Sequence, residues 1–208
     1  MEDNVKIIGI TGGIGSGKST VSEFISELGY PVINTDDKAK QLYVENKELK
    51  AKLIKEFGEE FYFQDGNINK EFIGNLIFGE SKESKENLSK LNSIVHPYVI
   101  QSNIDEIDKL VEEGEDIIFV ESALIFEINM QDAYNFVICV ISEQEQVVER
   151  LLKRGNLTEE KILNRIKNQL SPEEKKKKSD FVINNNSTLE ALKSSTLFVL
   201  DIISPEVE

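Results

Sequence analysis

The sequence has little cysteine and no long apolar run, and each shortage excludes a class of protein. Its single cysteine, Cys139, cannot form an internal disulfide. Because Cys139 lies in the apolar run 136–141, we interpret it as a buried structural thiol rather than a nucleophile. Reduced cysteine favours a cytoplasmic protein. No apolar run is long enough to cross a bilayer, so we expect neither a membrane span nor an export leader.

Basic residues are also scarce relative to acidic ones. The chain carries 24 Lys and Arg against 38 Asp and Glu, which gives a formal net charge of −14. This excess repels nucleic acids and anionic membranes, and we expect neither as a partner. An anionic substrate must therefore be bound by a few local cations and backbone amides. The composition is that of an ordinary globular chain, and a monomer is the favoured form.

Short apolar segments separated by helical patterns indicate the fold class. A β-branched run leads into a glycine-rich turn, and apolar residues at helical spacing follow from Ser19 to Leu28. The pattern of buried strands alternating with helices predicts an α/β fold with three layers and a parallel, five-stranded sheet. The expected strands are 5–10, 32–33, 117–120, 136–141 and 181–183.

About eighty residues separate the second and third expected strands, which is far more than one crossover needs. We expect a helical lobe there, over about 41–113. Three further helix starts are indicated by capping patterns: Ser142 with Glu145, Ser187 with Glu190, and Ser171 followed by a proline.

The most specific motif is Gly12-Gly-Ile-Gly-Ser-Gly-Lys-Ser19, which fits the P-loop pattern G-x-x-x-x-G-K-[ST] between a strand and a helix. Glycines let the backbone amides turn toward phosphate oxygens, and the helix start adds its positive dipole end. The motif predicts a P-loop NTPase fold that binds ATP with Mg²⁺, with Lys18 bridging the β- and γ-phosphates and the Ser19 hydroxyl on the metal. The residues expected to bind the nucleotide here are Gly13, Ile14, Gly15, Ser16, Gly17, Lys18, Ser19 and Thr20.

Two acidic residues follow expected strands at the edge where ligands of such folds bind. Asp36 comes after the second strand, and either orients and deprotonates an attacking hydroxyl or caps a helix. Glu121 ends the third strand, where P-loop proteins place a carboxylate for magnesium, and its extra methylene favours contact through water. The alternative for Glu121 is a solvent-facing strand end.

Three arginines stand close together in an acidic chain. Arg150 and Arg154 lie four residues apart, hence on one helix face, and Arg165 follows in the next helix. They are either a bidentate phosphate clamp or ordinary partners of neighbouring glutamates. The basic run 175–178 is typical of a solvated helix face.

Together these segments resemble the dephospho-CoA kinase family. The likeness is carried, in the family's order, by residues 8–21, 32–36, 96–97, 120–127, 149–154, 165–169, 175 and 179–185. It implies one domain over 1–208, with a nucleotide-binding core (about 1–40, 114–142 and 180–208), a substrate lobe (41–113) and a lid (143–179).

The resemblance implies transfer of the ATP γ-phosphoryl group to the 3′-hydroxyl of dephospho-CoA, the last step of CoA biosynthesis. Asp36 matches the second Asp of the family's Asp-Ala-Asp segment near the acceptor hydroxyl, Arg154 would neutralise the passing phosphoryl group, and Asn185 matches a position near the adenine. Departures from the family pattern are Asn34, Lys40 and Gly155, where the family has Asp, Arg and Asp.

Two other functions share these features. A nucleoside or nucleoside-monophosphate kinase has the same core, lid and inserted lobe, so the acceptor decides between the two enzymes. A P-loop switch protein would use its nucleotide state to gate a partner. The sequence lacks the Asn-Lys-x-Asp guanine motif, and a built-in arginine pair favours a kinase over a switch.

Overall fold

A computed structural model describes residues 5–79, 81–155 and 157–204. The chain divides into two compact units. The first comprises 1–34 and 109–208, and the second comprises 35–108. None of the described helices combines the length and the apolar character that a membrane-spanning helix requires.

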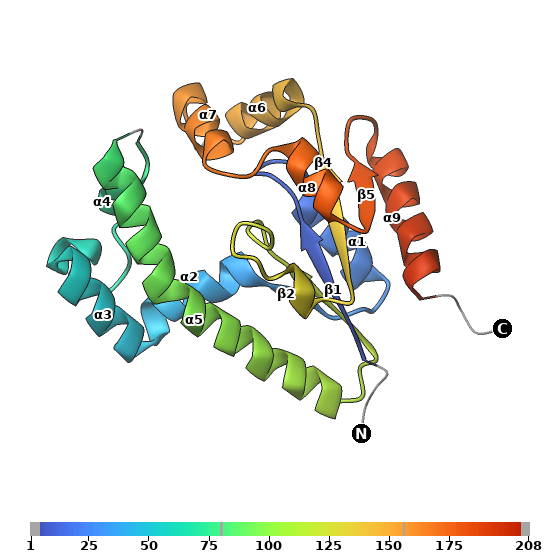
Figure 1. The fold of residues 1–208 in the computed structure, drawn as a ribbon, viewed down its shortest axis with the longest axis horizontal. Coiled ribbons are helices and arrows are strands. Elements are labelled where there is room, and N and C mark those ends of the chain that lie inside the picture. The colour runs from blue at the N-terminus through green and yellow to red at the C-terminus, as the bar shows by residue number, and fades with distance from the viewer. Residues whose placement is uncertain (1–4, 80, 156, 205–208) are drawn as a thin grey trace. The chain divides into compact units, whose positions relative to one another are not determined.

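The first unit is built on a five-stranded sheet of order β2-β3-β1-β4-β5, in which every paired strand runs parallel (Figure 1). The predicted α/β fold with a parallel sheet is therefore confirmed, and 181–183 is a strand. The observed bounds are β1 Lys6–Thr11, β2 Val32–Asn34, β3 Ile117–Glu121, β4 Phe136–Ile141 and β5 Phe181–Asn184.

Both faces of the sheet are covered, as the apolar strands require. On one face Ile8 and Ile10 pack with α1 (Lys18–Glu27) and α9 (Leu189–Ile203), which lie side by side in Figure 1. On the other face a Cβ at Gly9 would lie 2.8 Å from Ile125 Cδ1, so the loop after β3 approaches the strand closely. Glycine at this position therefore permits the loop to lie against β1.

Three helix starts after β4 were predicted from capping patterns, and the structure differs from the prediction in two of them. The Ser142 hydroxyl donates to the Asn185 carbonyl instead of capping α6, and Thr188, not Ser187, caps α9. Ser171 does form the predicted capping box, with Glu174. The observed bounds are α6 Gln144–Lys153, α7 Glu159–Lys167 and α8 Pro172–Lys178, with a 3₁₀ turn Gln131–Ala133 between β3 and β4.

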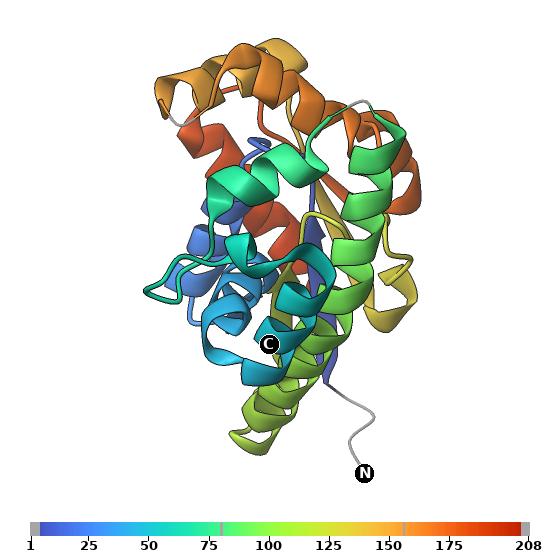
Figure 2. The same ribbon diagram turned by 90° about the vertical axis from the view of Figure 1, so that its left-hand side faces the viewer.

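The second unit is helical and has a core of its own. Figure 2 shows its helices running from blue α2 to green α5. Leu49 and Leu53 of α3 are buried together with Leu91 and Val95 from the first half of α5, each pair at helical spacing, and with Phe61 of the 3₁₀ turn. The bounds are α2 Thr35–Glu45, α3 Lys47–Phe57, a 3₁₀ turn Glu59–Phe61, α4 Lys70–Ile77 and α5 Lys82–Glu112, whose last residues belong to the first unit.

Candidate active site

The glycine-rich loop connects β1 to α1 at the carboxyl edge of the sheet, as the motif predicts. Gly15 and Gly17 have φ values of 71° and 101°, in the region that side chains other than glycine rarely adopt. A Cβ at Gly17 would also lie 2.1 Å from Asn185 Nδ2. Gly17 occupies the N-cap of α1 and has no side chain to cap it, so the first amides of the helix are left to an anion.

Lys18 is the cation of this loop. Its side chain folds back over the loop, with Nζ at 3.0 Å from the Gly12 carbonyl and 3.1 Å from the Gly13 carbonyl. Only 8% of the residue is exposed. The ammonium is therefore held against the loop backbone in a partly desolvated setting, where a cation attracts an anion more strongly than it does in water.

Two oxygen-bearing side chains meet beside the loop. The Ser19 hydroxyl, in the first turn of α1 beside Thr20, donates to Glu121 Oε1 at 3.1 Å, and Asn34 Nδ2 donates to Glu121 Oε2 at 3.1 Å. Glu121 is 5% exposed, so the alternative of a solvent-facing strand end is wrong. A hydroxyl and a buried carboxylate are hard oxygen ligands, which fit Mg²⁺ when substrate phosphates complete its shell. Among the described residues there is no larger cluster of acidic, His or Cys side chains suited to a metal.

Arg150 and Asn185 are linked by hydrogen bonds to each other and, through Asn185, to the phosphate loop. The Arg150 guanidinium donates to the Ser142 hydroxyl (3.1 Å), the Gln146 amide oxygen (2.9 Å) and the Asn185 carbonyl (2.7 Å). Asn185 Nδ2 donates to the Ser16 carbonyl at 2.8 Å. These three hydrogen bonds of Arg150 go to a hydroxyl, an amide oxygen and a carbonyl, and the Asn185 side chain binds the P-loop backbone.

The other residues that the sequence singled out are exposed or half-buried. Arg154 is the exposed C-terminal cap of α6, and Arg165 is half-buried in α7, where burial lowers the pKa of its guanidinium. Asp36 lies exposed in the first turn of α2, one residue inside the helix rather than at its cap. Lys40, in place of the family's arginine, forms an exposed ion pair with Asp37 at 2.6 Å, and this hydrogen bond raises the pKa of Lys40.

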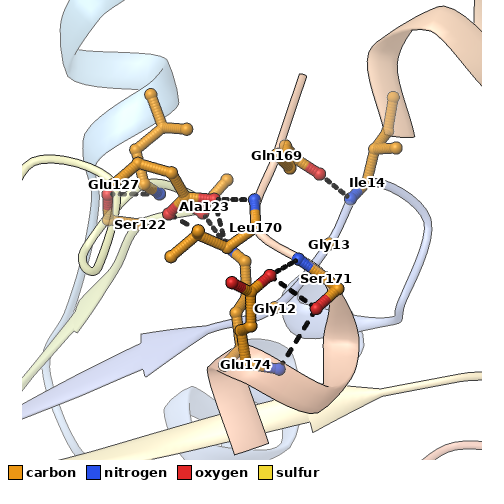
Figure 3. Close-up of polar contacts among 12 residues, drawn as sticks. Gly12, Gly13, Ile14, Ser122, Ala123, Glu127, Gln169, Leu170, Ser171 and Glu174 are labelled. Atoms are coloured by element: carbon orange, nitrogen blue, oxygen red, sulfur yellow. Dashed lines mark hydrogen bonds and ion pairs between the residues drawn. The ribbon is translucent and has the colours of Figure 1, made fainter. Parts of the chain in front are cut away.

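A partly buried polar network that the sequence did not reveal lies next to the loop (Figure 3). The amide N–H of Ile14 donates to Gln169 Oε1 at 2.9 Å, and the amide of Leu170 donates to Glu127 Oε1 at 3.0 Å. Lys175 Nζ lies 2.8 Å from Glu127 Oε1 and 2.6 Å from the Ala123 carbonyl. Because Lys175 is 1% exposed, the expectation of a solvated face is wrong at this position.

The comparisons with known proteins agree with this site. The family model described as Dephospho-CoA kinase matches residues 6–191. A dephospho-CoA kinase of Listeria innocua is 35% identical over 94% of this chain and 96% of its own. The crystal structure of TT1252 from Thermus thermophilus has a TM-score of 0.80 at 32% identity and covers 97% of this chain and 100% of its own.

A third comparison, with the structure of the dephospho-CoA kinase from Campylobacter jejuni, gives a TM-score of 0.68 at 26% identity and covers 96% of this chain and 97% of its own. The matched range includes the phosphate loop, the Ser19–Glu121 pair and the network around Glu127. The chain belongs to the dephospho-CoA kinase family.

Proposed function

We propose that this protein transfers the γ-phosphoryl group of ATP to the ribose 3′-hydroxyl of dephospho-CoA, giving CoA and ADP. The observation that carries the proposal is the family match over 6–191 together with a complete phosphate loop. The substrates are then ATP and dephospho-CoA, both of which an acidic protein binds through local cations and amides. We further propose a monomer of the cytoplasm, in keeping with the buried, unpaired Cys139.

The phosphate loop over 13–20 would bind the nucleotide through its backbone amides, except that of Ile14, which donates to Gln169 Oε1, and through Lys18. The Lys18 ammonium would interact with the β- and γ-phosphates, more strongly as charge moves during transfer. We expect Lys18→Ala to lower kcat/KM by about two to three orders of magnitude in a folded protein. Near-normal turnover in that variant would refute the role of Lys18.

Ser19 and Glu121 would hold Mg²⁺, Ser19 directly and Glu121 through water. When bound, the metal neutralises phosphate charge and orients the γ-phosphoryl group. Glu121→Gln removes the negative charge but keeps the shape, so we expect half-maximal activity at about tenfold higher Mg²⁺. If the Mg²⁺ dependence is unchanged, Glu121 only holds the Ser19 and Asn34 side chains in place through its hydrogen bonds.

Asp36 would orient or deprotonate the acceptor hydroxyl, since it follows β2 by two residues and matches the family's acidic segment. Asn34 cannot share this task, because an amide does not accept a proton and its side chain already donates to Glu121. Arg154 would neutralise the phosphoryl group in flight, and Arg150 and Asn185 would support the nucleotide site.

The acceptor is tested by measuring ADP release from MgATP with dephospho-CoA, AMP and adenosine in parallel. We expect dephospho-CoA to give a kcat/KM at least a hundredfold above that of either alternative. Faster turnover with AMP or adenosine would identify a nucleotide or nucleoside kinase. Slow ADP release that no acceptor stimulates would instead identify a nucleotide-dependent switch.

A further inference from the structure

The apex of the phosphate loop is held by residues from the region between β4 and β5. The Ile14 amide N–H donates to Gln169 Oε1 at 2.9 Å, although the two residues are far apart in the sequence. The Ile14 side chain packs against a buried cluster of Val147, Leu151 and Ile162 from α6 and α7. Backbone and side chain of Ile14 are therefore both fixed by this one region.

Gln169 is itself held in place. Its own amide donates to the Ile166 carbonyl at 3.2 Å, at the end of α7. The next amide, that of Leu170, donates to Glu127, whose carboxylate pairs with the buried Lys175 ammonium. Figure 3 shows the Gln169 side chain reaching the loop from the chain segment that this pair anchors. The backbone from which the Gln169 side chain extends is thus anchored on both sides, by the end of α7 and by the Glu127–Lys175 ion pair.

Packing around this part of the loop is incomplete. A cavity of about 70 Å³ is lined by Gly13, Ile14, Ser16 and Gln169 among others. The buried Ser16 hydroxyl has no hydrogen-bond partner among the described residues. Gly15, next to Ile14, brings a backbone with little intrinsic preference for one conformation. The hydrogen bond from Ile14 to Gln169 is therefore an important restraint on the loop apex.

We propose that Gln169 is a positioning residue of the phosphate loop, whose side-chain oxygen fixes the Ile14 amide and so keeps the loop in the shape that receives the nucleotide. The proposal rests on the proposed function only in that the loop binds ATP. A loop that already has its binding conformation loses less conformational entropy when the nucleotide binds, so the affinity is higher. Loss of one such restraint should weaken nucleotide binding about five- to tenfold.

The test compares Gln169→Met, which keeps the length but removes the acceptor, with Gln169→Glu, which keeps an oxygen acceptor. Gln144→Met is the matched control, because Gln144 is an exposed amide lining the same cavity. Amide hydrogen exchange at Ile14 is followed by NMR without nucleotide. The affinity for a non-hydrolysable ATP analogue with Mg²⁺ is measured by calorimetry, beside the unfolding midpoint.

We expect Gln169→Met to speed exchange at Ile14 at least tenfold and to weaken the analogue five- to tenfold, with Gln144→Met unchanged. Gln169→Glu should restore protection of Ile14. The proposal is overturned if Gln169→Met leaves the exchange rate of Ile14 or the affinity for the analogue unchanged. It is also overturned if Gln144→Met has equal effects, or if Gln169→Glu does not restore the protection of Ile14. If Gln169→Met does not fold, Gln169→Asn, whose amide is one methylene too short, replaces it. No readout needs an acceptor, so a wrong acceptor assignment would leave this test intact.

Discussion

The ion pair between Glu127 and Lys175 gives the most quantitative prediction, because almost no solvent reaches the ammonium. Lys175 is 1% exposed at its side chain, Glu127 is 16% exposed, and 2.8 Å separates Nζ from Oε1. Removing one charge leaves the other buried without compensation, which costs about 3–5 kcal/mol. In Glu127→Gln the Ala123 carbonyl still accepts from the ammonium, so we take the lower value, about 3 kcal/mol.

For a chain of this length, 1 kcal/mol shifts the thermal midpoint by about 2–4 °C. Glu127→Gln should therefore lower the midpoint by about 6–12 °C. The double variant Glu127→Gln with Lys175→Met removes both charges. Its loss of unfolding free energy should be smaller than the sum of the losses in the two single variants, and the difference, the coupling energy, should be about 1–3 kcal/mol.

Urea unfolding followed by circular dichroism gives the free energies for this double-mutant cycle. The control is Glu149→Gln, because Glu149 pairs with Lys153 at only 2.6 Å but both side chains are largely exposed. We expect no measurable change of midpoint in the control, since water screens the pair. If Glu127→Gln and Glu149→Gln behave alike, burial does not set the strength of these pairs and the reasoning fails.

Three further predictions concern the loop, the thiol and the proposed base. Gly17→Ala places a Cβ 2.1 Å from Asn185 Nδ2, at a φ of 101°. We expect the folded variant to lose nucleotide binding, measured by calorimetry, and retained binding would contradict the loop geometry. Burial raises the pKa of Cys139 to about 11, so at pH 8 only about one thiol in a thousand is ionised. Iodoacetamide should therefore label Cys139 only after the protein unfolds. Rapid labelling of the native protein would show that the thiol is accessible. Asp36→Asn should lower kcat by about two orders of magnitude while Asp37→Asn changes it little, and equal, mild effects in steady-state assays would remove Asp36 from the chemistry.

Much of the fold was predictable because its signals are local. The strands β3 and β4 are continuous apolar runs, and the phosphate loop is a contiguous motif in which Gly12, Gly15 and Gly17 adopt positive φ values. The end of β3 at Glu121 followed from the same pattern. Capping patterns were less reliable, because the Ser142 hydroxyl donates to the distant Asn185 carbonyl and does not accept from the first amides of α6.

The sequence by itself determined the phosphate loop, the parallel sheet and the family, since each depends on residues adjacent in the chain or on a periodic pattern. Only the tertiary structure decided which distant side chains meet. Lys175 stands in a basic run typical of a solvated face, yet it is buried because Glu127, 48 residues away, supplies its counter-charge. Gln169 reaches Ile14 because packing of α6 and α7 brings it there. No local pattern encodes such pairs, because their energy depends on burial and distance, which exist only once the chain has folded.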